Sequence, residues 1–191
     1  LKNNLYNLFA QFAATPDLNL QAEYRYRETI TGDLASHFDG SFNHSVHREI
    51  DQDVARAGAH YSLSPQTDII ASVIYTDRDS ISMYPTINLT IGTRATGYQA
   101  EAQLLHTAND FNLTTGLGTY TLDFDGIGFE SSDRVEQEIA YGYANIKWPE
   151  KLIWTVGLSY QADDNPTLNR NELNPKFGVQ WAINDNLSLR A

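Results

Sequence analysis

Side chains alternate between apolar and polar along most of this chain, with a period of two residues. Between residues 18 and 27, one parity carries Leu18, Leu20, Ala22, Tyr24 and Tyr26, and the other carries Asn19, Gln21, Glu23, Arg25 and Arg27. Successive side chains of a β-strand point to opposite faces of its sheet, whereas helical spacing does not produce this pattern. The alternation therefore predicts strands with one apolar and one polar face.

The same alternation recurs down the chain and predicts an all-β fold, an antiparallel up-and-down meander of about ten strands. The expected strands are 4–13, 17–29, 52–63, 67–78, 88–107, 110–124, 134–148, 151–162, 172–182 and 185–191. In 67–78 both parities are apolar. In 134–148 we expect a bulge that shifts the register, because Tyr141 and Tyr143 share the parity of Asn145 and Lys147.

The connections between the expected strands alternate in length. Tight links with Pro, Asn or Asp lie near residues 15–17, 64–68, 107–110, 149–151 and 184–186, and longer polar links cover 30–51, 79–87, 125–133 and 163–171. Short turns on one side and long loops on the other are typical of outer-membrane β-barrels, whose strands need about nine to eleven residues to cross. The pattern predicts part of the wall of a transmembrane β-barrel.

Aromatic residues gather near the tight turns and support the membrane interpretation. The residues concerned are Phe12, Tyr61, Phe111, Trp148, Trp154 and Trp181. Such residues form girdles at membrane interfaces. The alternative is a soluble β-sheet module, whose strands also alternate. The many alanines of the apolar parity, such as Ala55, Ala57 and Ala102, favour lipid as the neighbour, because a dry core prefers large interdigitating side chains.

Composition excludes several functions. The net charge of −11 argues against a nucleic-acid partner, whose phosphates would be repelled. The chain has no cysteine, so thiol and disulfide chemistry is excluded. It also has no apolar run of about 18 residues, so a membrane-spanning helix is not expected.

If the tight turns face the periplasm, both ends of the chain lie on the opposite side. We therefore expect residues 1–191 to be a single segment of a barrel that lacks flanking strands at both ends. A small ten-stranded barrel of opposite orientation is the alternative, and it would need long periplasmic loops.

The polar parity supplies candidate lumen-facing residues. These are Glu23, Arg25, Arg27, Arg56, His60, Gln99, Glu101 and Gln103. In a water-filled barrel such side chains contact a plug or bias the passage of solutes. The alternative is cross-strand ion pairing without any ligand, worth a fraction of a kcal/mol for each pair.

The long link 30–51 contains candidate metal ligands, His44, His47 and Glu49. Imidazole and carboxylate suit a divalent ion, but the spacing matches no compact motif, and a solvated loop is the alternative. No nucleophile and no carboxylate pair is arranged for catalysis, so we expect neither a cofactor nor an enzyme activity.

The last residues resemble a known family. The string Leu173-Asn174-Pro175-Lys176-Phe177-Gly178-Val179-Gln180-Trp181, followed by a turn and Leu187-Ser188-Leu189-Arg190-Ala191, resembles barrel strands of TonB-dependent outer-membrane receptors. It is also similar to the barrel of outer-membrane proteins that carry tetratricopeptide repeats.

The resemblance implies a barrel in the outer membrane of a Gram-negative bacterium, with the lipid bilayer, a plug domain and the TonB complex as partners. It implies the uptake of iron chelates, vitamins or glycans. The alternatives are an exopolysaccharide or secretion porin and a soluble β-sheet binding module.

Overall fold

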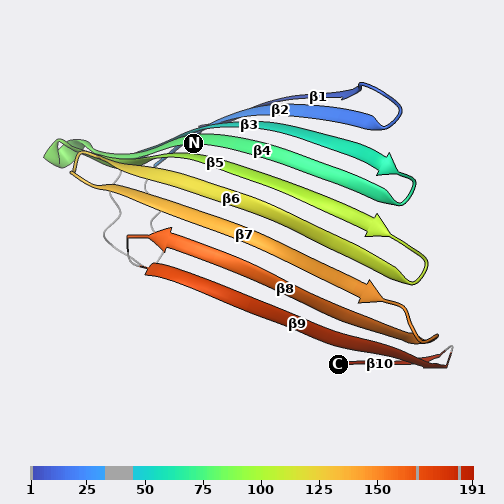
Figure 1. Ribbon diagram of the computed structural model, residues 1–191. Coiled ribbons are helices and arrows are strands. Elements are labelled where there is room, and N and C mark those ends of the chain that lie inside the picture. Colours follow the sequence, from blue (N-terminus) through green and yellow to red (C-terminus); the bar gives the residue numbers. More distant parts are fainter. Residues whose placement is uncertain (1, 33–44, 167, 185) are drawn as a thin grey trace.

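The fold is a single antiparallel sheet, seen here in a computed structural model that describes residues 2–32, 45–166, 168–184 and 186–191. Ten strands pair in sequence order, each with the next. They are β1 (Lys2–Ala13), β2 (Leu18–Gly32), β3 (His47–Ser64), β4 (Thr67–Tyr84), β5 (Leu89–Thr107), β6 (Phe111–Ile127), β7 (Ser132–Ile146), β8 (Leu152–Asn165), β9 (Leu168–Asn184) and β10 (Leu187–Arg190). Figure 1 shows them as one curved layer. The predicted meander is confirmed.

Strand ends at the tight turns agree with the sequence, but the opposite ends extend further than predicted. Strand 67–78 continues to Tyr84, where the short 3-10 turn η1 (Pro85–Ile87) leads into β5, and strand 52–63 begins earlier, at His47. Residues 30–32 and 47–51 of the first predicted long link, and 79–84 of the second, are therefore hydrogen-bonded strand. On the face that carries Tyr75, the next residue is the charged Asp77, so the apolar pattern stops there. Backbone hydrogen bonding between β3 and β4 nevertheless continues beyond Asp77.

The predicted bulge in 134–148 is wrong. β7 pairs with β6 from Ser132 to Ile146 and with β8 from Glu136 to Ile146 in continuous register. Tyr141 and Tyr143 therefore remain on the parity of Asn145, opposite Gly116 and Thr114 of β6. The strand keeps its register and presents its bulky residues to the polar side of the sheet.

The described residues form no second layer and almost no core. Val46, which is 3% exposed, is the only buried hydrophobic residue among them, while Leu8, Leu117 and Phe177 are 71%, 65% and 71% exposed. A sheet normally buries its apolar face against another element of its own chain. The cover of this face must come from outside the described residues. We found no helix in the described part of the chain that is long and apolar enough to cross a membrane.

Candidate functional site

One face of the sheet, here called the polar face, holds all eight residues that the sequence analysis selected for a lumen. Glu23 on β2 lies opposite Arg56 on β3, and the same ladder continues through Ile74 on β4 to Gln99 on β5. The other predicted residues follow at intervals of two along the same strands: Arg25, Arg27, His60, Glu101 and Gln103. The structure therefore groups them by face, as the alternation predicted.

The charged members of this group form only part of the predicted ladder. Glu23 accepts from Arg25 at 2.8 Å and from Arg56 at 3.4 Å. Arg27 instead donates to the Thr29 hydroxyl at 3.2 Å. Because the two arginines bound to Glu23 are 43% and 47% exposed, each pair contributes at most about 1 kcal/mol.

His60 pairs away from this cluster, toward the tight turn of β3 and β4. Its Nε2 lies 3.0 Å from Oδ1 of Asp68, and the Ser62 hydroxyl donates to the same oxygen at 2.8 Å. The predicted residues thus divide into an ion-paired group around Glu23 and a separate contact at the turn.

Further along the polar face, Glu101 is the acceptor of a small network. Its Oε1 accepts from the Tyr141 hydroxyl at 2.6 Å and from Nε2 of Gln103 at 2.8 Å. Gly116 makes this approach possible, because a Cβ there would lie 2.6 Å from the Tyr141 hydroxyl oxygen. A pocket of about 190 Å³ opens beside the network over Gly118. Its lining includes Gln99, Glu101, Tyr120, Gln137 and Tyr141.

Tyr141 and Tyr143 form an aromatic pair on the polar face, which the sequence analysis missed. Their ring centroids are 5.7 Å apart, and the Lys176 ammonium lies 5.4 Å from the centre of the Tyr143 ring. Gly157, opposite Tyr143 on β8, leaves the space for that ring. The parity of the two tyrosines already indicated that they lie on the polar face. The sequence analysis instead explained that parity by a bulge.

The other face, here called the apolar face, carries an inclined hydrophobic band. One ladder of directly opposed residues runs from Leu20 on β2 through Ala102 on β5 to Leu173 on β9. On β2 the apolar run extends from Leu18, beside a tight turn, to Tyr26, so Leu20 lies near its tight-turn end. On β9 the run extends from Leu173 to Trp181, which lies beside a tight turn, so Leu173 is at the end away from that turn. The band therefore crosses the ladder obliquely, as expected for strands tilted in a barrel.

The predicted interface aromatics mark the tight-turn edge of this band. Phe12, Tyr61, Phe111, Trp154 and Trp181 share the register of the apolar face. Trp148 lies in the connection from β7 to β8, where its carbonyl accepts from the Trp154 indole at 3.1 Å.

A second row of tyrosines, missed by the sequence analysis, marks the opposite edge of the band on β1, β2, β4 and β5. Tyr6 lies opposite Tyr26, and Tyr75 lies opposite Tyr98, with ring centroids 6.2 Å and 5.0 Å apart. Their position at the end of each apolar run, away from the tight turns, is the signal that could have identified them.

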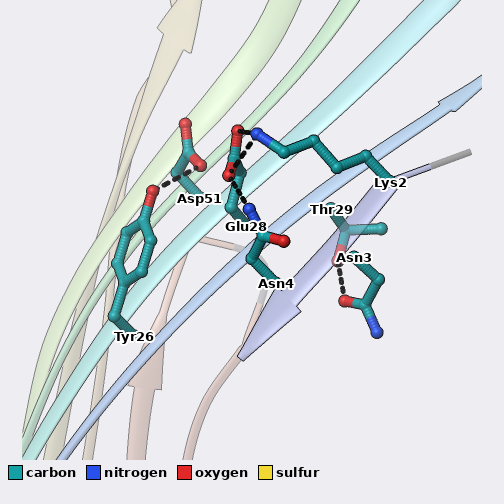
Figure 2. A network of polar contacts seen from close by, with 7 residues as sticks. All are labelled: Lys2, Asn3, Asn4, Tyr26, Glu28, Thr29 and Asp51. Atoms are coloured by element: carbon teal, nitrogen blue, oxygen red, sulfur yellow. Dashed lines mark hydrogen bonds and ion pairs between the residues drawn. The ribbon is translucent and has the colours of Figure 1, made fainter. Parts of the chain in front are cut away.

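Beyond this second row the same face becomes charged. Figure 2 shows Glu28 accepting from Lys2 and Asn4, and Tyr26 donating to Asp51 at 3.3 Å. Asp53 and Asp51 lie opposite Asp77 and Asp79. Like charges in such positions repel each other in the absence of solvent or counter-charges, so this segment belongs in water.

Asp79 has its own counter-charge on β5. Arg94 donates to its two carboxylate oxygens at 2.7 and 2.6 Å, and these hydrogen bonds hold the pKa of Asp79 below its usual range. The pair lies beyond Tyr75, outside the apolar band.

The predicted metal ligands do not assemble into a site among the described residues. His44 lies outside them. His47 and Glu49 share one face at the start of β3, opposite Met83 and Ile81, and no group of three His, Cys, Asp or Glu in the described part of the chain is placed to hold a metal ion.

Comparison with known proteins gives a family. The profile of the family described as "TonB dependent receptor-like, beta-barrel" matches residues 1–191. A search of curated proteins gave no match.

Solved structures share the fold at low sequence identity. A mutant of the ferric enterobactin receptor from Pseudomonas aeruginosa is 13% identical, with a TM-score of 0.81 over 98% of this chain and 32% of its own. The FrpB iron transporter from Neisseria meningitidis is 14% identical, with a TM-score of 0.77 over 96% and 34%. The alcaligin outer membrane receptor FauA from Bordetella pertussis is 15% identical, with a TM-score of 0.67 over 96% and 33%.

The chain spans about a third of the length of these relatives. Their barrels explain the single curved layer and the inclined apolar band. The chain belongs to the TonB-dependent receptor-like β-barrel family and is a segment of a barrel in the outer membrane of a Gram-negative bacterium.

Proposed function

We propose that this segment is part of the wall of a transporter that imports a solute in a TonB-dependent step. The apolar face contacts lipid hydrocarbon, and the polar face lines the lumen. The observation that carries the proposal is the inclined apolar band, which has aromatic rows at both of its edges and a hydrogen-bonded polar face behind it. A water-filled interior accommodates the Glu23 and Glu101 networks, which hydrocarbon would not.

Further strands would complete the barrel. β1 and β10 are the two edges of the sheet and do not pair with each other. An open edge leaves backbone groups unpaired, which hydrocarbon does not tolerate. The matched structures are about three times as long as this segment, which supports further strands outside it.

The proposed partners are a plug domain inside the lumen and the TonB complex in the periplasm. The polar residues around Glu101 and Tyr141 would contact the plug or the passing solute. Because two of the similar structures are named for ferric enterobactin and alcaligin and a third is called an iron transporter, ferric chelates are the solutes to test first.

Uptake of labelled ferric chelates by cells that produce the full-length protein tests the proposal. We expect uptake to require both the protein and a functional TonB. Uptake that is unchanged without TonB would contradict the proposal and would favour an open or secretion porin.

Adjacent residues of β5 provide a matched pair of variants. Gln99→Trp adds bulk to the polar face and narrows the proposed lumen, whereas Ala100→Trp adds a similar bulk to the apolar face. At equal amounts in the membrane, Gln99→Trp should reduce uptake and Ala100→Trp should not. The reverse result would refute the assignment of the faces.

A further inference from the structure

Arginines gather on the polar face of β2, β3 and β4, although the chain carries a net charge of −11. Along the described lengths of these three strands, that face has only two carboxylates, Glu23 and Asp68, and Asp68 lies beside the tight turn. The arginines of the same face, placed by the strand register, are Arg25, Arg27, Arg48, Arg56 and Arg78. This part of the polar face is therefore basic in an acidic chain.

The other carboxylates of the three strands lie on the opposite face, which has no lysine or arginine along the same described lengths. They are Glu28, Glu49, Asp51, Asp53, Asp77 and Asp79, and Figure 2 shows two of them, Glu28 and Asp51. The backbone separates the two sets of charges, because successive side chains of a strand point to opposite faces. At physiological ionic strength salt screens exposed charges over about 8 Å, so these carboxylates neutralise the arginines only in part.

Two of these arginines, Arg27 and Arg78, have no carboxylate partner among the residues that the structure describes. Arg25 and Arg56 both donate to Glu23, whereas Arg27 donates only to the neutral hydroxyl of Thr29, at 3.2 Å. Arg27 and Arg78 are both exposed. Each of them therefore keeps guanidinium donors that can bind a ligand.

Arg27 and Arg78 lie on one row of directly opposed residues, with Gln52 between them. Neighbouring strands are about 4.8 Å apart, so the two Cα atoms are separated by about 10 Å, a span that two arginine side chains can close. Each guanidinium has a planar fork of N–H donors, and the Gln52 amide adds donors and an acceptor. These three residues, here called the arginine row, can therefore bind one ligand from both sides.

The arginine row lies toward the outer end of the sheet. Arg78 lies beyond Tyr75 along β4, and Arg27 lies beyond Tyr26 along β2, in both cases away from the tight turns. Because tight turns of outer-membrane barrels face the periplasm, a solute that arrives from outside meets this level first. Charge of one sign on the wall of a cleft concentrates solutes of the opposite sign and speeds their capture.

We propose that the arginine row binds acidic oxygen groups of the transported solute and selects solutes of net negative charge. Hydrogen bonds from a guanidinium to a carboxylate, phenolate or phosphate oxygen are short and strong, and they often form in pairs. A neutral solute lacks these bonds, and a positively charged solute is repelled. The inference rests on the proposed transport function, and its competitor is an acidic segment of the full-length protein that occupies the row.

The test compares two ferric complexes of similar size, an anionic one formed by a tricatecholate and a neutral one formed by a trihydroxamate. Equilibrium binding of each, labelled with radioactive iron, is measured on outer membranes that contain the full-length protein. We expect the anionic complex to bind at least tenfold more tightly, and added sodium chloride to weaken the binding of that complex alone. Equal binding of the two, tighter binding of the neutral complex, or binding of neither would overturn the proposal. TonB-dependent uptake of the neutral complex alone would do so while leaving the transport proposal intact.

Two variants locate the binding groups. Arg27→Gln and Arg78→Gln should each weaken binding of the anionic complex about tenfold, because each removes charged hydrogen bonds. Arg94→Gln, on the opposite face of β5, removes the same charge from the chain and should leave this binding unchanged. Equal losses in all three variants, or no loss in any, would refute the site. If an acidic segment occupied the row, Arg27→Gln and Arg78→Gln would destabilise the folded protein in a urea titration without changing the preference for the anionic complex, and this result would also refute it.

Discussion

At the scale of single residues, glycines decide where bulky polar-face side chains fit. Gly116 and Gly157 lie opposite Tyr141 and Tyr143, and a Cβ on Gly157 would lie 2.1 Å from Cδ1 of Tyr143. Because neighbouring strands are only about 4.8 Å apart, a ring can lie across the adjacent strand only where that strand has no side chain. The glycine and tyrosine positions therefore form one packing unit.

Gly157→Ala tests this unit. We expect a loss of about 1–3 kcal/mol in the free energy of unfolding, measured by urea titration in lipid vesicles, because the Tyr143 ring must move. Gly142→Ala is the control, since its Cβ would lie 3.8 Å from the nearest atom, the Thr115 hydroxyl. Tyr143→Ala has its own cost, because it removes the contacts with Tyr141 and Lys176, but in that background Gly157→Ala should cost little further. Equal effects of the two glycine substitutions would contradict the packing argument.

Arginine substitutions test the assignment of the faces. Ala57→Arg and Ala102→Arg place a charge inside the apolar band and should each lower the free energy of unfolding in a bilayer by about 2–4 kcal/mol. Gln99→Arg places its charge on the polar face and should leave the free energy of unfolding nearly unchanged. The same urea titration measures all three, and similar losses at both parities would refute the assignment.

At the scale of strands, the sequence predicts an element well where it meets lipid and poorly beyond it. The tight-turn ends of β4 and β5, at Thr67 and Thr107, coincide with the predicted ones because apolar residues continue almost to the turn in both strands. The opposite end of β4, at Tyr84, lies beyond Asp77 and Asp79, where water contacts both faces and the period-two signal disappears. Backbone pairing alone extends the hairpin there.

The Asp79 and Arg94 pair makes the end of this hairpin sensitive to pH. The pKa of Asp79 is lowered in the folded state, so its contribution to stability is present above the ordinary carboxyl range near pH 4 and is lost as the pH falls through the folded pKa. Because the Arg94 side chain is 55% exposed, the contribution is at most about 1 kcal/mol.

Hydrogen exchange of β4 and β5, corrected for the intrinsic rate, measures this effect. We expect protection beyond Tyr75 to fall below about pH 4 in the native protein. In the Arg94→Gln variant, these amides should already be less protected at pH 7 than in the native protein. Their protection should also change less with pH. Identical pH profiles of the two proteins would exclude the ion pair as the cause.

At the scale of the whole molecule, the sheet is a single layer that has almost no core, and this indicates which solvent surrounds its apolar face. Ten strands leave large residues such as Leu8 and Phe177 exposed, which a protein in water would have to cover. The sequence predicted the layer and, on most strands, the membership of its faces, because both follow from parity; the exceptions are β4, where both parities are apolar, and β7, where we expected a bulge. It did not predict the Glu101 network or the tyrosine pair, because each depends on which residues of different strands lie opposite one another.

Lipid contact of the apolar face is the central claim, and it can be measured residue by residue. This segment has no cysteine. Once every cysteine outside it has been replaced by serine, single cysteines introduced at successive positions from Tyr98 to Gln103 in β5 can carry a fluorophore in the full-length protein. We predict that bromine-labelled lipid tails quench the label at 98, 100 and 102, and that a water-soluble quencher reaches it at 99, 101 and 103. Quenching that does not alternate, or that alternates with the opposite parity, would contradict the account.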